Sequence, residues 1–268
     1  FKIRHRRRHA CAGSTKLLCR KSIAVFSEKV TQRATIGQLR QHHGAAVLKL
    51  DFLAEHLGRL ETTDVVIANC TSDVAILESF FPSGQGPVVC HLPLPLRSNQ
   101  FRPQDRDRCR KGIPLRLQPD LIGFIGRLTP QKNAHLFLEA LHRIRERLHP
   151  REIGGLIIGS PYHNLILDYP AEKHYYEYLL DLRSDLGLAE RVHFIEGTPN
   201  PQQLAQCYSV IQLLFHPTHT IDENFGYVPI EAMACGIPVI ATRHAGIGSL
   251  VEDEANGWLV GEGDVDSL

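Results

Sequence analysis

Short apolar runs alternate with stretches of helical periodicity along the second half of the chain. Apolar runs of strand length occupy residues 121–125, 155–159, 192–195, 211–215 and 237–241. In the stretches between them apolar residues recur at helical spacing, which predicts helices near 133–148, 171–186, 200–209 and 227–235. Strands that alternate with helices form parallel sheets covered by helices. We therefore predict a doubly wound α/β domain over residues 120–268.

The same alternation runs through residues 22–96, but with fewer strands and helices than a complete domain of this kind would have. Strands are predicted at 23–26, 45–50, 64–69 and 87–90, and helices at 36–42, 52–60 and 71–81. This part is predicted to be an incomplete domain of parallel β/α units. Residues 91–119 hold five prolines and seven Lys or Arg against two Asp. That composition is typical of a linker between domains, which we place at 97–119.

Composition excludes some classes of function and leaves the N-terminus open. The formal charge of +1 gives no general reason to expect nucleic acid as a partner, and no apolar run approaches the ~18 residues of a membrane span. The seven cysteines form no C-x-x-C pair, so free thiols in a reducing, cytoplasmic compartment are expected. Residues 1–21 carry eight Lys or Arg and no acid. Lacking the apolar core of a signal peptide, they are predicted to be a disordered basic tail, with a peripheral membrane contact left open.

A loop and a short helix at residues 223–235 carry the first candidate site. Pro229 suits a first helical turn, and the free N–H groups of that turn, at Gly226 to Val228, predict an anion site. Glu223 and Glu231 flank it, eight residues apart. Carboxylates so placed are suited to accept hydrogen bonds from sugar or ribose hydroxyls. The alternative is an acid near a helix N-terminus plus a solvated Glu.

The second candidate site is the segment G-R-L-T-P-Q-K at residues 126–132. It follows a predicted strand and precedes an amphipathic helix, so it lies at the carboxyl end of a strand, where open α/β sheets bind ligands. Arg127 offers a planar fork and Lys132 a point charge for phosphate oxygens. The alternative is a pair of solvated loop cations.

Together with three further segments, these motifs resemble a known family. The further segments are G-L-I-I-G-S at 155–160, R-V-H-F-I-E-G at 191–197 and A-G-I-G-S-L-V-E-D-E-A-N-G-W-L-V at 245–260. In this order they resemble the nucleotide-sugar glycosyltransferases of the GT-B fold, specifically the retaining family 4 (glycosyl transferases group 1). The resemblance implies an α/β fold of two Rossmann-like domains, the N-terminal one incomplete. Against the family pattern, the sequence is expected to be truncated at both ends.

The resemblance also implies roles for single residues. Catalytic roles fall to the diphosphate-binding pair Arg127 and Lys132 and to Glu223 beside the donor sugar. Glu231 corresponds to the glutamate that accepts the ribose hydroxyls. The remaining donor-binding positions are Gly126, Gly159, Ser160, Ile195, Glu196, Asn224, Phe225, Gly226 and Tyr227. No metal and no cofactor are expected, because the cations and the helix N-terminus can take the part that a metal plays elsewhere.

The implied reaction moves a hexose from a nucleotide diphosphate sugar to a hydroxyl of a glycan or lipid-linked acceptor, with retention, as in polysaccharide biosynthesis. Two alternatives stay open: a non-catalytic nucleotide-sugar binding module, and another GT-B enzyme such as a nucleotide-sugar epimerase or phosphorylase. The acceptor-side histidine of the family has no match after the strand at 23–26. His216 and His219 are expected to line the sugar site or to pack, since two ligands are too few for a zinc site.

Overall fold

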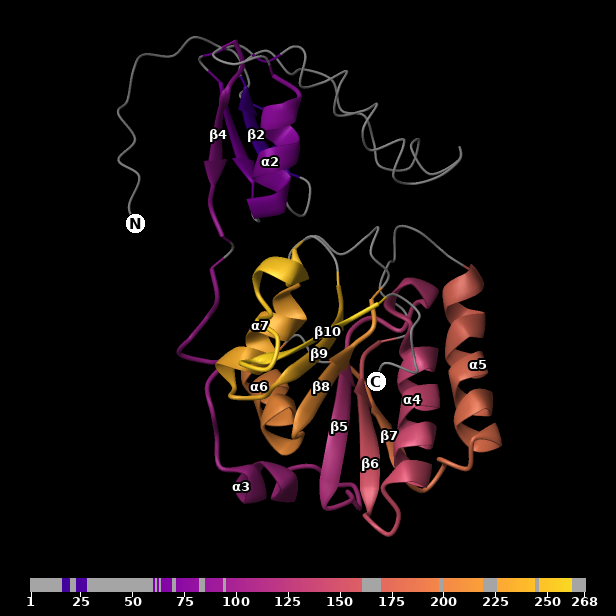
Figure 1. Cartoon of the computed structure of the whole chain (residues 1–268). Coiled ribbons are helices and arrows are strands. Elements are labelled where there is room, and N and C mark those ends of the chain that lie inside the picture. The colour runs from indigo at the N-terminus through magenta and orange to yellow at the C-terminus, as the bar shows by residue number, and fades with distance from the viewer. Residues whose placement is uncertain are drawn as a thin grey trace. The chain divides into compact units, whose positions relative to one another are not determined.

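The computed structural model describes residues 16–19, 23–27, 60, 62, 64–68, 71–81, 85–93, 95–160, 170–197, 200–218, 226–243 and 246–261. The chain divides into two compact units, Phe1–Pro93 and Leu94–Leu268. Each unit has its own sheet (Figure 1). The predicted helix at 36–42, the predicted strand at 45–50 and nearly all of the predicted helix at 52–60 lie outside the described residues.

The first unit contains a four-stranded sheet in the order β1-β2-β3-β4. Its elements are β1 (Lys16–Cys19), β2 (Ile23–Ser27), β3 (Val65–Ala68), α2 (Thr71–Ser79) and β4 (Val88–His91). Val66, Ala68 and Leu77 are fully buried between the sheet and α2. β3 and β4 are parallel, as predicted. The parallel prediction is wrong for β2, which runs antiparallel to β3, and β1 lies inside the stretch predicted as a disordered tail.

The second unit is built on a six-stranded sheet in the order β10-β9-β8-β5-β6-β7, and all its strands are parallel. The strands are β5 (Asp120–Ile125), β6 (Ile153–Ile158), β7 (Val192–Ile195), β8 (Leu213–His216), β9 (Val239–Thr242) and β10 (Gly257–Val260). The five predicted strands of this domain are confirmed. β10, at the edge beside β9, was not predicted as a strand.

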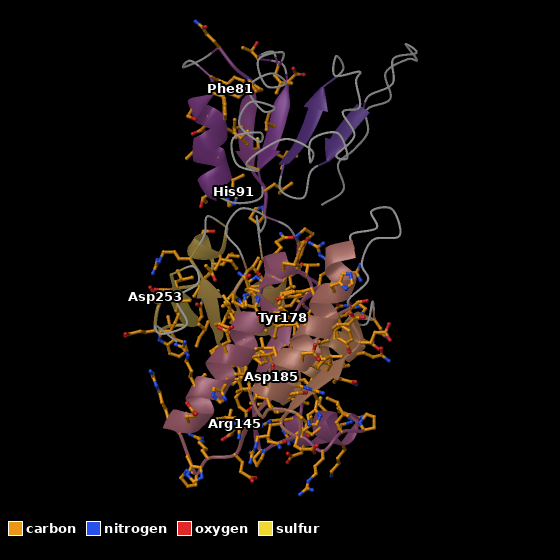
Figure 2. All side chains as sticks on the ribbon, turned by 90° about the vertical axis from the view of Figure 1, so that its right-hand side faces the viewer. Phe81, His91, Arg145, Tyr178, Asp185 and Asp253 are labelled. Atoms are coloured by element: carbon orange, nitrogen blue, oxygen red, sulfur yellow. The ribbon has the colours of Figure 1, made fainter. Side chains whose placement is uncertain are left out.

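Helices cover both faces of this sheet (Figure 1). One face holds α4 (Ala134–Arg147) and α5 (Pro170–Asp185), and the other holds α3 (Arg106–Lys111), α6 (Pro201–Val210) and α7 (Tyr227–Ala234). Alternate strand residues serve the two cores: Leu214 packs with the α6 side and Phe215 with the α4 side. On α5, Tyr175 is buried while Tyr178 faces solvent (Figure 2). Each face of the sheet therefore has its own apolar core, as expected for this class.

The stretch predicted as a linker belongs to the second unit. Residues 97–119 contain α3, which Asp105 caps by accepting a hydrogen bond from the Arg108 N–H at 2.7 Å. Phe101 and Cys109 are buried in the core shared with α6. The proline-rich, basic composition of this segment gave no indication that these two residues are buried. Their burial packs the segment against the domain. The finer domain limits stay predictions.

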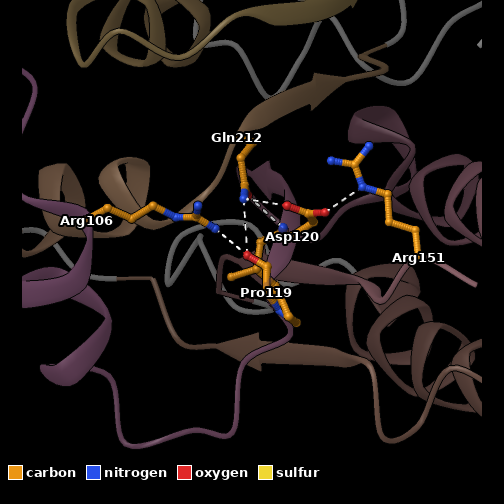
Figure 3. A network of polar contacts seen from close by, with 6 residues as sticks. Arg106, Pro119, Asp120, Arg151 and Gln212 are labelled. Carbon is orange, nitrogen blue, oxygen red and sulfur yellow. Dashed lines mark hydrogen bonds and ion pairs between the residues drawn. The ribbon is translucent and has the colours of Figure 1, made fainter.

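A polar network ties the amino-terminal end of β5 to its surroundings (Figure 3). The Asp120 carboxylate accepts hydrogen bonds from Arg151 at 2.8 Å and from the Gln212 amide at 3.1 Å. Arg106 and Gln212 both donate to the Pro119 carbonyl, and the Gln212 carbonyl accepts the Leu121 N–H at 2.7 Å. The polar groups at the start of β5 are thus hydrogen-bonded to other groups of the chain.

Candidate donor-binding site

The strand order defines where a ligand would enter the second unit. From β5 the chain moves to one side through β6 and β7, then returns to the other side of β5 with β8. This reversal is the topological switch point, and open α/β sheets bind ligands outside the carboxyl ends of the strands there. The residues at that place are Gly126 and Arg127 after β5, and Pro217 and Thr218 after β8.

Backbone contacts join the neighbouring strand ends at this edge. The Gly126 N–H donates to the Ile158 carbonyl and the Gly159 N–H to the Ile195 carbonyl, both at 3.0 Å, and the Leu128 N–H reaches the Ser160 carbonyl at 3.2 Å. A Cβ at Gly159 would collide with the carbonyl oxygen of Gly126. Glycine is therefore required for this approach. The strand ends at Gly126, Gly159, Ser160 and Ile195 therefore lie side by side, and their role in donor binding stays a prediction.

Arg127 and Lys132 lie on a loop that is anchored across the switch point. The loop closes in a short 3₁₀ turn, Pro130–Lys132, followed by Asn133 in the left-handed conformation with φ 53°. The Asn133 side-chain amide donates to the Pro217 carbonyl at 2.9 Å. This bond couples the loop after β5 to the loop after β8. It holds two half-buried cations at the place where the strand order reverses.

The helix α7 starts directly after a constrained glycine. Gly226 is buried with φ 79°, and a Cβ there would collide with the Ile247 side chain. The helix therefore begins at a fixed point, and the N–H groups of its first turn belong to Tyr227 and Val228. Glu223, Asn224, Phe225 and His219 lie outside the described residues.

Among the described candidate residues, Glu231 is the acid whose pKa is shifted from its ordinary value. It lines a pocket of about 560 Å³ together with Arg97 and the apolar residues Leu96, Phe101 and Leu204. The Tyr208 hydroxyl donates to Glu231 Oε2 at 2.9 Å. Burial raises the pKa of Glu231 to about 7, and the bond from Tyr208 offsets part of that rise. A carboxylate with so little water around it gains from hydroxyl donors of a ligand.

Sequence reasoning missed three residues of this region. Asn133 and Tyr208 act through tertiary contacts, which a local sequence pattern does not predict. Thr129 is buried, and its hydroxyl has no hydrogen-bond partner in the described part of the chain. His216 is also buried, with Nε2 3.0 Å from the Thr218 hydroxyl. Packing, one of its two expected roles, agrees with this position.

Metal-ligand clusters and membrane-spanning helices are both absent from the described residues. Within the described ranges, no group of three or more His, Cys, Asp or Glu side chains is arranged to hold a metal ion. Among the helices in those ranges, none has the length and apolar character needed to cross a membrane.

This geometry defines the class of the second unit: a doubly wound α/β domain with its topological switch point between β5 and β8. The family model described as glycosyl transferases group 1 matches residues 105–268. The chain belongs to this family, which confirms the resemblance read from the motifs.

Curated relatives and solved structures agree with this assignment. The chain is 33% identical over 197 residues to a D-inositol 3-phosphate glycosyltransferase of Nocardia farcinica, covering 74% of this chain and 41% of the relative. The enzyme of that name from Corynebacterium urealyticum is 30% identical over 204 residues, covering 75% and 46%. The chain thus spans less than half the length of the curated relatives it matches.

Two structures share the fold over most of the chain. Anabaena HepE, solved in complex with UDP and glucose, has a TM-score of 0.64 at 23% identity, covering 84% of this chain and 55% of HepE. Sucrose-phosphate synthase of Thermosynechococcus elongatus has a TM-score of 0.64 at 25% identity, covering 87% and 54%. The α/β GT-B fold class predicted from the sequence is confirmed by these neighbours.

Proposed function

We propose that this chain is the donor-binding part of a retaining glycosyltransferase, which moves a hexose from a nucleotide diphosphate sugar to a hydroxyl of a glycan or lipid-linked acceptor. The observation that carries the proposal is the switch point between β5 and β8. There the Asn133–Pro217 bond fixes a loop bearing Arg127 and Lys132. The names of the curated relatives and the UDP and glucose bound to HepE support this reading.

Arg127 and Lys132 take the diphosphate in this proposal. Each charge-assisted hydrogen bond to a phosphate oxygen is worth roughly 1.5–3 kcal/mol net, and Arg adds a planar fork. As the glycosidic bond breaks, negative charge grows on the departing nucleotide. Positive groups already in place stabilise that charge without reorganisation. The two cations would therefore contribute to the chemical step as well as to binding.

The resemblance assigns Glu231 to the ribose hydroxyls and Glu223 to the donor sugar. It assigns the N–H groups at Gly226 and Tyr227, with Asn224 and Phe225, to the sugar and phosphate. The strand ends at Gly159, Ser160, Ile195 and Glu196 face the base. The attack of the acceptor occurs on the same face from which the nucleotide departs, so no nucleophile of the protein and no metal ion is required.

A binding-only role is the second candidate. It is favoured by one observation: the residues assigned to the donor all lie in the second unit. In that case the chain would bind a nucleotide sugar and turn nothing over.

Calorimetric titration of the full chain separates these outcomes. UDP, GDP, ADP and their sugars are titrated into the wild type, Arg127→Ala and Glu231→Ala, with Arg147→Ala, an exposed arginine at the far end of α4, as the control. We expect one nucleotide to bind and to lose affinity in the first two variants only. Sugar transfer to an added acceptor then identifies the transferase, and binding without transfer identifies the binding module. Absence of binding by every nucleotide would contradict the proposal.

A further inference from the structure

Tyr208 is the residue that meets Glu231 from inside the domain. It lies on α6, and its side chain is fully buried. Its hydroxyl is 2.9 Å from Glu231 Oε2 and 3.2 Å from the Val228 carbonyl oxygen. Its ring packs edge-on against Phe101, with centroids 6.1 Å apart at 76°. The ring cannot turn away without disturbing the core, so the hydroxyl is held in one place.

A single hydroxyl proton faces two acceptors, and this gives the pair two arrangements. When Glu231 is ionised, Tyr208 donates to the carboxylate, since a bond to a charged acceptor is the stronger one. When Glu231 carries a proton, the carboxyl group can donate to the Tyr208 oxygen, and Tyr208 then donates to the Val228 carbonyl. In the first arrangement Oε2 is occupied by the protein, and Oε1 is left to accept a hydroxyl of a ligand in the pocket.

We propose that Tyr208 is a positioning residue, which holds the Glu231 carboxylate ionised and oriented to accept a ribose hydroxyl of the donor nucleotide. The proposal rests on the proposed function, because it names how that same site binds the ribose. It gives a role in ligand binding to Tyr208, a buried side chain that does not contact the ligand itself. A glutamate that must order its own long side chain on binding loses affinity through entropy, and a fixed partner removes that cost.

The other titratable or charged groups around Glu231 do not duplicate this contact. Tyr227 and Cys235 lie on α7 itself, and the charge of Glu231 adds to the rise that burial gives the pKa of each. Arg97 lines the same pocket from the segment before α3. Among the hydrogen bonds of the described residues, the one that reaches the Glu231 side chain comes from Tyr208.

The first test removes the hydroxyl and follows UDP affinity against pH. Tyr208→Phe is compared with Tyr175→Phe, which removes the hydroxyl of a buried tyrosine on the opposite face of the sheet, bonded to His135 at 2.9 Å. For wild type, UDP affinity should improve as pH rises through the titration of Glu231. Tyr208→Phe should shift that midpoint up by about one pH unit and weaken binding about tenfold near pH 6, below both midpoints. An unshifted midpoint, or an equal shift in Tyr175→Phe, would overturn the proposal.

The second test needs no ligand. The carboxyl carbon of Glu231 is followed by NMR against pH in the free chain, in wild type and Tyr208→Phe. Its titration should move to higher pH in the variant, and no such movement would overturn the role of Tyr208. If it moves while no nucleotide binds, the proposed function fails and the pairing stands. In a Glu231→Gln background, Tyr208→Phe should have no further effect on UDP affinity beyond about twofold; a full tenfold loss there would show that Tyr208 acts by another route.

Discussion

Carboxylates at the two ends of the parallel strands have different surroundings. We call the side where the strands begin the amino edge of the six-stranded sheet and the side where they end the carboxyl edge. At the amino edge Asp120 meets the Arg151 guanidinium at 2.8 Å and the Gln212 amide at 3.1 Å, both supplied by the chain. At the carboxyl edge Glu231 meets one neutral hydroxyl, and burial raises its pKa to about 7. At the amino edge, groups of the protein supply the hydrogen bonds of Asp120. At the carboxyl edge, the poorly solvated Glu231 can still accept hydrogen bonds from a ligand. This pattern is expected where stability is exchanged for binding.

The largest effect is expected where the carboxyl edge is closest packed. In Gly159→Val the new side chain meets the carbonyl oxygen of Gly126, which is backbone and cannot rotate away. We expect the free energy of unfolding to fall by about 3 kcal/mol or more, the range of severe overpacking. Denaturant unfolding measures it. Gly248→Ala, where nothing lies within 4 Å of a new Cβ, is the control. Equal stability of Gly159→Val and wild type would refute the close contact.

Glu231→Gln should stabilise the chain while it weakens nucleotide binding. Near pH 4 both the native and the unfolded carboxyl are protonated, so Glu231 costs nothing there. Between its ordinary pKa and about 7 the native state keeps a proton that the unfolded state has lost, so stability falls as pH rises. Above pH 7 the variant should therefore gain about 2 kcal/mol. Thermal unfolding near pH 5 and pH 8 tests it, and a gain independent of pH would contradict the account.

Asn133 should matter through both its side chain and its backbone. Asn133→Ala removes the bond to the Pro217 carbonyl and places alanine at φ 53°. We expect a loss of about 1–2 kcal/mol in stability and weaker UDP binding, because the loop with Arg127 and Lys132 is released. Asn133→Gly keeps the backbone conformation and loses only the bond, so it should lie between alanine and wild type. If Asn133→Ala and Asn133→Gly lost the same stability, the left-handed backbone at residue 133 would not contribute to the loss, which would contradict this prediction.

Asp120→Asn gives the smallest effect and the sharpest contrast with Glu231→Gln. It weakens a half-exposed ion pair with Arg151, a contact of the kind worth at most about 1 kcal/mol. Stability should fall slightly, and UDP affinity should stay that of wild type because the residue lies at the opposite edge. Denaturant unfolding and titration calorimetry on one preparation check both. A marked loss of affinity would break the division between the two edges.

Local patterns predicted five of the six strands of the second sheet and missed the edge strand β10. The strands β5 to β9 are apolar runs between helical segments, so periodicity found them. β10 has four residues, of which Gly257 is buried, Leu259 and Val260 are partly buried and Trp258 is exposed, so its apolar pattern is short and weak. α3 was hidden in a proline-rich basic stretch. The antiparallel pairing of β2 was missed because strand direction depends on tertiary pairing and not on the apolar run itself.

The candidate site divides in the same way. Gly126, Arg127, Lys132, Gly226 and Glu231 stand in linear motifs, so the sequence could indicate them. Tyr208 and Asn133 act on residues 23 and 84 positions away, and such contacts exist only once the sheet has formed. The roles assigned to the motif residues stay predictions until a ligand is titrated.

The most direct measurement is a titration of the isotope-labelled full chain with UDP, followed by backbone amide NMR. The account predicts that the shifts move at Gly126 to Lys132, at Gly159 and Ser160, and along α7 around Glu231. The amides of Arg106, Asp120, Arg151 and Gln212 should stay in place. Shifts confined to that amino edge, or no shifts at a saturating nucleotide concentration, would contradict a donor site at the switch point.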